Sequence, residues 1–278
     1  MLSDLNLASI MRTVCERKDR MQLRETFESV AESYDAARPS YPDALVDDLV
    51  ALARIPPGGR VLEIGPGTGK ASVALAARGL ALVGVELGER LAAVARRNLA
   101  GFPRAEIVVA DFETWEPEQA EFDAVTAFTA LHWIAPEVRY SKSARLLRSG
   151  GALAVVQTVH VMPPGGDPFF AEVWEDYNAV APGDDHGPPP ALEEVADLGD
   201  EIEATGLFAE GAVRRRLWQV EQTPDDYIAV LGTYSNNLAL SPEQRDELFA
   251  RIRARIRSGP RGSVMQTFLL TLNVARKP

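Results

Sequence analysis

The sequence has little cysteine, no long apolar run and fewer basic than acidic residues. Cys15 is the one cysteine in 278 residues, which excludes an internal disulfide framework and a thiolate-rich metal site. No apolar stretch approaches the roughly 20 residues of a membrane span. The N-terminus carries basic residues but lacks the apolar region of a secretory signal, and Met21 is an alternative start. We therefore expect a cytoplasmic protein without a metal.

The charge balance limits the kinds of partner that the protein is expected to bind. Asp and Glu number 40 against 29 Lys and Arg, giving a formal net charge of -11. Such a chain has no overall electrostatic attraction for a phosphate backbone, so we expect no nucleic-acid partner and no membrane partner. Hydrophobic residues make up 46% of the chain, enough for a sizeable core. We expect a monomer or homodimer that acts on a small molecule.

Short apolar runs alternate with helical patterns in the first 158 residues. Because parallel strands buried on both faces appear as continuous apolar runs, this rhythm predicts βαβ units. Strands are expected at 60–64, 81–85, 107–110, 123–128 and 152–158, with helices at 71–77, 89–98 and 136–147 between them. The last of these strands follows the turn at Gly150 and Gly151.

The pattern changes after residue 158. Helical spacing is found at 167–180, 192–205, 224–234 and 242–256, and strands are expected at 213–220 and 267–275. We predict four segments. Residues 1–42 form an N-terminal helical segment closing over a cofactor, 43–158 form the cofactor-binding core, 159–210 form a cap insertion, and 211–278 complete the sheet with packing helices.

A glycine-rich loop joins the first strand to the following helix. Ligands bind at the carboxyl edge of a parallel sheet, and glycines there allow the backbone to approach them. The loop places Gly65, Gly67 and Gly69 after Glu63. In a dinucleotide site, with the pattern G-x-G-x-x-G, the third glycine comes one position later than Gly69 does here. In a P-loop, four residues separate the first glycine from the last, whereas three residues separate Gly65 from Gly69. A carboxylate two residues before the first glycine is suited to a cationic group.

Carboxylates also follow the next two strands. Glu86 ends the second strand, where an acidic side chain can accept hydrogen bonds from a ribose diol. Asp111 ends the third strand and can accept from an exocyclic adenine amine, with Phe112 beside it. Successive strand ends thus offer groups for an amino acid, a ribose and an adenine.

These motifs, together with residues 122–133, resemble class I S-adenosylmethionine-dependent methyltransferases over about residues 25–158. Residues 27–42 also resemble the small-molecule branch that includes trans-aconitate methyltransferase. The resemblance implies a Rossmann-like α/β fold with a seven-stranded, mostly parallel sheet, helices on both faces, N-terminal helices and a helical cap. It also implies S-adenosylmethionine as cofactor, with S-adenosylhomocysteine as product.

The resemblance assigns each cofactor-binding residue a role. The methionine part would be held by Glu63 and the loop residues Gly65, Pro66, Gly67, Thr68 and Gly69. The ribose would be bound by Glu86, and the adenine by Leu87, Asp111 and Phe112. The sulfonium pocket would be lined by Phe128, Thr129 and Ala130, and the N-terminal side would be closed by Tyr34 and Arg38.

His132 is the candidate catalytic residue. It follows the fourth strand, where an imidazole can accept a proton from a hydroxyl nucleophile or position the acceptor, although a packing role is an equal alternative. His160, just past the fifth strand, is a second histidine that can face the pocket. We expect transfer to a hydroxyl or carboxylate oxygen of a small organic acceptor. A nicotinamide-dependent oxidoreductase, a non-enzymatic cofactor-binding protein and a protein methyltransferase are the alternatives.

Overall fold

The computed structural model describes residues 30–182 and 187–278. Cys15, Met21 and most of the expected N-terminal helical segment lie outside these residues. The chain divides into two compact units. Unit 1 contains residues up to Arg38, Val159–Ala196 and Leu217–Leu269, and unit 2 contains Pro39–Thr158, Asp197–Arg216 and Leu270–Pro278.

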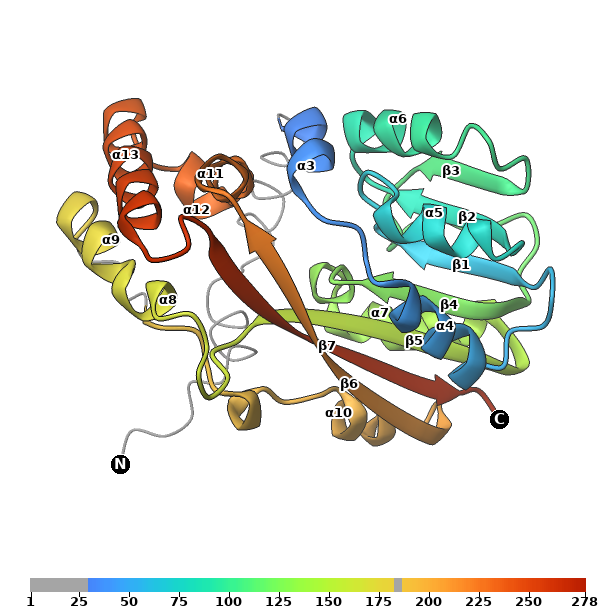
Figure 1. Ribbon diagram of the computed structural model, residues 1–278. Coiled ribbons are helices and arrows are strands. Elements are labelled where there is room, and N and C mark those ends of the chain that lie inside the picture. Colours follow the sequence, from blue (N-terminus) through green and yellow to red (C-terminus); the bar gives the residue numbers. More distant parts are fainter. Residues whose placement is uncertain (1–29, 183–186) are drawn as a thin grey trace. The chain divides into compact units, whose positions relative to one another are not determined.

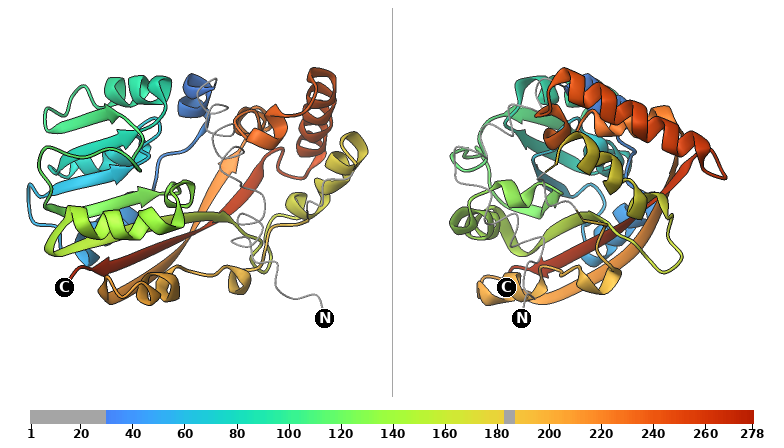
Figure 2. Two further views of the ribbon diagram at one scale, coloured as in Figure 1. Left: turned by 180° about the vertical axis from the view of Figure 1, so that it is seen from behind. Right: turned by 90° about the vertical axis from the view of Figure 1, so that its left-hand side faces the viewer.

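Unit 2 contains the alternating strands and helices that the sequence predicts. Its strands are β1 (Arg60–Ile64), β2 (Ala81–Glu86), β3 (Ala105–Val109) and β4 (Phe122–Phe128). Its helices are α4 (Asp43–Leu52), α5 (Lys70–Ala77), α6 (Glu89–Asn98), α7 (Pro136–Leu146) and α10 (Gly199–Ala204), with a 3-10 turn η1 (Leu131–Trp133) after β4. Helices α4 and α5 lie on one face of these strands and α7 lies on the other (Figures 1 and 2).

The sheet has seven strands in the order β3-β2-β1-β4-β5-β7-β6 (Figure 1). β5 (Leu147–His160), β6 (Ala209–Gln222) and β7 (Val264–Arg276) complete it. The pairs from β3 to β5 are parallel. β7 runs antiparallel to β5, because Gly150 N donates to Lys277 O and Val161 N to Thr267 O. The expected mostly parallel, Rossmann-like sheet is confirmed.

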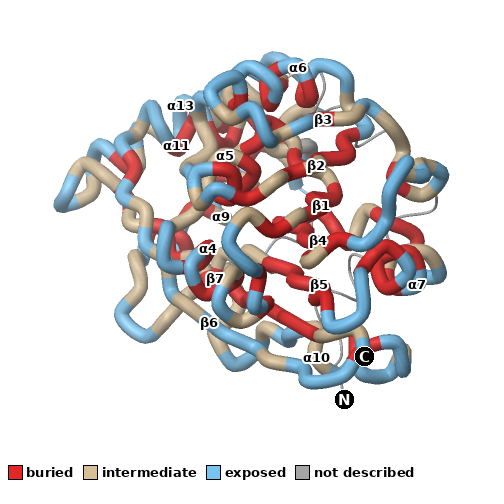
Figure 3. The backbone as a smooth tube through the Cα atoms, turned by 90° about the vertical axis from the view of Figure 1, so that its right-hand side faces the viewer, coloured by how far each residue is buried: buried red, intermediate tan, exposed pale blue. Residues whose placement is uncertain are grey.

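Burial follows this topology. The central strands are enclosed and the outer faces of the helices are exposed (Figure 3). Leu62 of β1 and Phe122 and Val125 of β4 have no exposed surface. Enclosure of this kind explains why these strands appear in the sequence as apolar runs without polar alternation.

Unit 1 contains the remaining helices of the described residues. They are α3 (Ala31–Ala37), α8 (Phe169–Glu172), α9 (Trp174–Val180), α11 (Pro224–Leu231), α12 (Ser235–Leu238) and α13 (Pro242–Ser258), together with a 3-10 turn η2 (Leu192–Glu194). The longest, α13, begins with a capping box, in which Ser241 Oγ accepts from Gln244 N and Pro242 takes the first helical position. Its residues Leu248, Ile252 and Ile256 pack in a core with α8, α9 and α11.

Three elements differ from the sequence expectations. The helix expected at 167–180 is two short helices, with Val173 ending α8 and preceding α9. In place of the one helix expected at 192–205, the structure has the 3-10 turn η2 and the helix α10, with an irregular stretch between them. β5 begins at Leu147, before the turn expected at Gly150, and its pairing with β4 is irregular between Phe122 and Ala124. Gly150 has a φ of +72°, which a strand residue other than glycine rarely adopts.

Candidate functional site

The carboxyl ends of β1, β2, β3 and β4 meet at one edge of the sheet in unit 2. The parallel register pairs Ile64 with Val85 and with Ala127, and pairs Glu86 with Val109. The residues at and just after these strand ends are therefore neighbours, although they come from positions 63 to 132 of the chain. The predicted cofactor-binding groups of unit 2 lie along this edge.

The glycine loop depends on left-handed backbone conformations. Gly65, Gly67 and Gly69 have φ values of +62°, +59° and +86°, which other residues adopt only with strain. A Cβ on Gly65 would lie 2.9 Å from Ala130 Cβ, so the first glycine permits a close approach of two segments. A Cβ on Gly67 would meet nothing within 4 Å. The loop thus packs closely on the protein at Gly65 and faces open space at Gly67.

Glu63 is buried beneath this loop. Its side chain is 1% exposed, and its Oε2 accepts a hydrogen bond of 2.6 Å from Ser72 Oγ in α5. The pKa of Glu63 is raised to about 7, chiefly by burial and also by the nearby charge of Glu86, while the Ser72 hydrogen bond acts in the opposite direction. A cationic ligand group near Glu63 would favour the ionised carboxylate.

Glu86 connects the second strand to the loop. Its Oε2 accepts from Gly67 N at 2.8 Å and its Oε1 accepts from Gly88 N at 2.9 Å. Leu87, next along the chain, is 39% exposed. A carboxylate fixed by backbone amides next to an exposed apolar side chain is a suitable surface for a sugar and a flat base. In the same loop, Thr68 Oγ1 is buried without a hydrogen-bond partner in the described part of the chain.

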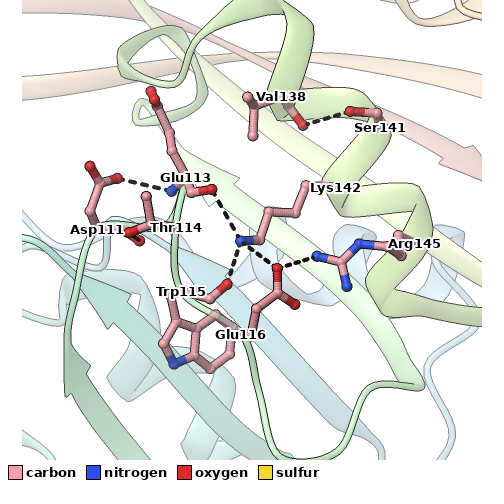
Figure 4. A network of polar contacts seen from close by, with 9 residues as sticks. All are labelled: Asp111, Glu113, Thr114, Trp115, Glu116, Val138, Ser141, Lys142 and Arg145. Carbon is pink, nitrogen blue, oxygen red and sulfur yellow. Dashed lines mark hydrogen bonds and ion pairs between the residues drawn. The ribbon is translucent and has the colours of Figure 1, made fainter.

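The segment after β3 is held by hydrogen bonds from within and from α7 (Figure 4). Asp111 Oδ1 accepts from Glu113 N at 2.9 Å. Lys142 of α7 donates to the carbonyl of Trp115 and, at 3.4 Å, to Glu116 Oε1. The ring of Phe112 is 3% exposed and packs in the core, so its predicted place beside adenine stays a prediction.

The backbone turns sharply where β4 ends. Thr129 has a φ of +53°, an unusual conformation for a β-branched residue, and its N–H donates to Val156 O at 2.8 Å. Thr129 Oγ1 lies 3.2 Å from Thr158 Oγ1 and 3.4 Å from the hydroxyl of Tyr41. The ring of Tyr41 packs at 5.0 Å on Phe128. Strain held by several contacts is typical of functional sites.

His132 lies in η1, beyond this turn. Its ring is 4.8 Å from that of Trp133. Burial, and secondarily the charge of Arg139, lower the pKa of His132 to about 4. The imidazole is therefore neutral at physiological pH and has one nitrogen that can accept a hydrogen bond.

Tyr34 and Arg38 belong to unit 1. Arg38 Nε donates to Thr233 Oγ1 at 3.0 Å, and its guanidinium lies 4.3 Å from the Tyr234 ring and 5.2 Å from the Tyr34 ring. Their predicted closing of the cofactor stays a prediction.

Three residues of this edge are not among the predicted site residues: Ser72, Tyr41 and Lys142. Tyr41 and Lys142 act through partners 88 and 27 residues away in the sequence, so no local spacing points to them. Ser72 lies nine residues after its partner Glu63, a spacing that no local motif singles out. Among the described residues, no group of three or more His, Cys, Asp or Glu side chains is placed to hold a metal ion. In the same residues, no helix is both long and apolar enough to cross a membrane.

Comparisons with known proteins agree with this geometry. Residues 61–151 match a family described as a methyltransferase domain. An uncharacterized methyltransferase of Mycobacterium bovis is 36% identical over 143 residues, which cover 51% of this chain and 54% of the relative. A demethylmenaquinone methyltransferase of Clavibacter sepedonicus is 32% identical over 141 residues, covering 49% of this chain and 58% of the relative. The match thus spans little more than half the length of these relatives.

A solved structure shares the fold over most of the chain. A protein described as a putative type II methyltransferase from Anaeromyxobacter dehalogenans has a TM-score of 0.61 and 24% identity, covering 86% of this chain and 97% of its own. The matched domain contains β1, the glycine loop, Glu86 and Asp111. Residues 61–151 therefore match the methyltransferase domain family, and the chain shares the fold of the Anaeromyxobacter protein.

Proposed function

We propose that the protein transfers a methyl group from S-adenosylmethionine to an oxygen, hydroxyl or carboxylate, of a small organic acceptor. The observation that carries this proposal is the line of groups along one sheet edge. Buried Glu63, the loop open at Gly67, the backbone-bonded Glu86 and Asp111 lie at or just after the ends of three adjacent strands, in the order that suits an amino acid, a ribose and an adenine.

The cofactor would be held by the chain's own polar groups. Glu63 offers a carboxylate to the methionine ammonium, and its raised pKa makes ionisation sensitive to such a cation. Glu86 accepts from the ribose hydroxyls, Leu87 covers the base and Asp111 accepts from the adenine amine. The buried, unpartnered Thr68 Oγ1 is a further polar atom of the loop that a ligand can satisfy.

Methyl transfer from this cofactor requires little of the protein beyond alignment of the reacting groups. The bound cofactor supplies an electrophilic methyl group and a good leaving group. The chain must therefore orient the acceptor and exclude water, which lowers the barrier by fixing the reacting geometry. Tyr41 packed on Phe128, and Thr129 in its constrained turn, give the end of β4 a fixed shape. His132 is neutral at pH 7 and is the proposed residue that positions the acceptor by a hydrogen bond, because a pKa of about 4 makes its imidazole a weak proton acceptor.

Acceptor choice is assigned to the segments outside the matched domain. We propose that residues 159–210 act as the cap and that residues 1–42, with Tyr34 and Arg38, close the cofactor site. The Clavibacter relative is named for demethylmenaquinone, which supports a small organic acceptor here without identifying it. A branch like trans-aconitate methyltransferase, a cytoplasmic location and a monomeric or homodimeric state belong to the same proposal.

Calorimetry with S-adenosylhomocysteine tests the central claim. We expect saturable binding that Asp111→Ala weakens, with NAD as a ligand that fails to bind. Absence of S-adenosylhomocysteine binding, or binding of NAD in its place, would contradict the proposal.

His132→Ala should lower turnover more than cofactor affinity, and unchanged turnover would assign His132 a packing role.

A further inference from the structure

Unit 1 contains a row of three partly exposed rings on one face of its strands. The row consists of His160 at the end of β5, Phe268 in β7 and Trp218 in β6, and these strands are consecutive neighbours. The ring of Phe268 lies 5.8 Å from that of His160 and 5.4 Å from that of Trp218. Phe170 of α8 meets the His160 ring edge-on at 4.4 Å. Aromatic surface is therefore concentrated beside one histidine.

Buried polar atoms without partners lie on the same face. Val161 N bonds Thr267 O, which places His160 opposite Phe268, and side chains alternate along a strand, so Gln266 shares the face of Phe268. Among the residues that the structure describes, neither His160 Nε2 nor Gln266 Oε1 has a hydrogen-bond partner. Gln266 is only 2% exposed. Native proteins seldom leave such atoms unsatisfied, which points to a hydrogen-bonding group supplied from outside the chain.

We propose that this face of unit 1 binds a planar, unsaturated ring compound that carries a hydroxyl group. The ring packs on Phe268 and Trp218, and the hydroxyl bonds His160 Nε2 or Gln266 Oε1, which requires a side-chain rotation because both atoms are buried in the free protein. The inference rests on the proposed function only in taking this compound to be the methyl acceptor.

The chemistry of the face selects a hydroxyl. Gln266 Oε1 is an acceptor and repels a carboxylate. Burial lowers the pKa of His160 to about 4, so the imidazole is neutral and offers no positive charge to an anion. A hydroxyl both donates and accepts, and it therefore satisfies Nε2 in either tautomer of a neutral histidine. Flat aromatic side chains favour a flat ring, which stacks on them or meets them edge-to-face.

The probe is 2-naphthol, with naphthalene as the analogue that lacks the hydroxyl, titrated against the full chain in fluorescence and calorimetry. We expect saturable binding of 2-naphthol, about tenfold tighter than that of naphthalene, which corresponds to one satisfied hydrogen bond. His160→Phe and Gln266→Met keep the size of each side chain and remove its polar atom. At least one of them should abolish the preference for 2-naphthol.

Gln219→Met is the matched control. Gln219 lies on the same strand as Trp218 but on the opposite face, where its Nε2 is 3.4 Å from Thr267 Oγ1. It should bind 2-naphthol as the wild type does, and melting temperatures report whether each variant folds. Failure of 2-naphthol to saturate, equal affinity for naphthalene, or an unchanged preference in both site variants overturns the inference.

S-adenosylhomocysteine binding, measured in parallel, separates the two proposals. Binding of S-adenosylhomocysteine without 2-naphthol rejects this face as a ring site and leaves the proposed function standing. The reverse result rejects the proposed function and supports the ring site.

Discussion

Glu86 ties the glycine loop to the end of β2, since its two carboxylate oxygens accept from Gly67 N and Gly88 N. Glu86→Gln replaces one of these oxygens with an amide nitrogen that cannot accept from an N–H group. One backbone bond is therefore lost beside the proposed ribose site. We expect S-adenosylhomocysteine to bind at least about tenfold more weakly, or ~1.4 kcal/mol, in isothermal titration calorimetry.

Glu89→Gln is the control for this prediction. Glu89 is an exposed acidic residue in the first turn of α6, and its loss removes the same charge from the same region. Its affinity should stay close to that of the wild type. Equal weakening in both variants would mean that charge alone, and not the bonds of Glu86, determines the affinity.

Glu63 makes the stability of unit 2 depend on pH. Its pKa of about 7 in the folded chain lies above its ordinary value of 4.5, chiefly because of burial. A group whose pKa is raised by folding contributes stability below pH 4.5, and this contribution is lost as the pH rises through 7. Glu63→Gln keeps an oxygen that can accept from Ser72 and removes the ionisation. Relative to the wild type, the variant should gain up to about 3 kcal/mol between pH 5 and pH 8.

Thermal melts of both proteins across this pH range measure the gain. A difference in melting temperature that stays constant from pH 5 to pH 8 would show that Glu63 does not titrate there. Addition of S-adenosylmethionine, whose ammonium favours the carboxylate, should reduce the pH dependence of the wild type.

At the scale of elements, α7 positions the segment that follows β3. Lys142 is 6% exposed, and its ammonium lies 5.3 Å from the Phe112 ring while it donates to the Trp115 carbonyl (Figure 4). Lys142→Met keeps the apolar stem and removes these bonds. We expect a several-fold rise in KM for S-adenosylmethionine with kcat retained, because the segment contains Asp111 and not the reacting atoms.

Arg145→Met provides the matched comparison. Arg145 lies in the same helix, three residues after Lys142. It also pairs with Glu116, at 2.7 Å, from an exposed position. Exposed ion pairs contribute little free energy, so the KM of Arg145→Met for S-adenosylmethionine should equal that of the wild type. A fall in kcat for Lys142→Met, or the same KM in both variants, would argue against a positioning role.

Elements were predictable where one local pattern dominates. The strands of unit 2 are apolar because both faces are covered, and Gly65 to Gly69 mark the turn after β1 through their backbone freedom. The break at Val173 was not predictable, because apolar residues at helical spacing, Phe170, Val173 and Trp174, continue through it. The stretch before α10 is likewise set by a tertiary bond, in which Leu198 N donates to Asn273 Oδ1.

At the scale of the whole molecule, the order of strands along the chain predicts which side chains lie at the same edge of the sheet. It does not predict which contacts hold each of these side chains in place. Glu63, Glu86 and Asp111 could be placed together from the sequence, since parallel strands end on one side. The hydroxyl of Tyr41 near Thr129 and the ammonium of Lys142 near Trp115 join positions 88 and 27 residues apart. Such contacts depend on the folded arrangement of helices, which no local spacing encodes.

The two units are expected to unfold in one cooperative transition. β5, β6 and β7 each contain residues of both units, with the division at Thr158, Arg216 and Leu269. A strand that loses its pairing on one side of the division destabilises its own continuation, so neither unit can keep its sheet while the other unfolds. Differential scanning calorimetry should show one peak, with calorimetric and van't Hoff enthalpies in agreement. S-adenosylhomocysteine at about 100 times its dissociation constant stabilises the native state by about 2.7 kcal/mol and should move the whole peak. Two peaks, of which only one responds to the ligand, would show that the units unfold independently.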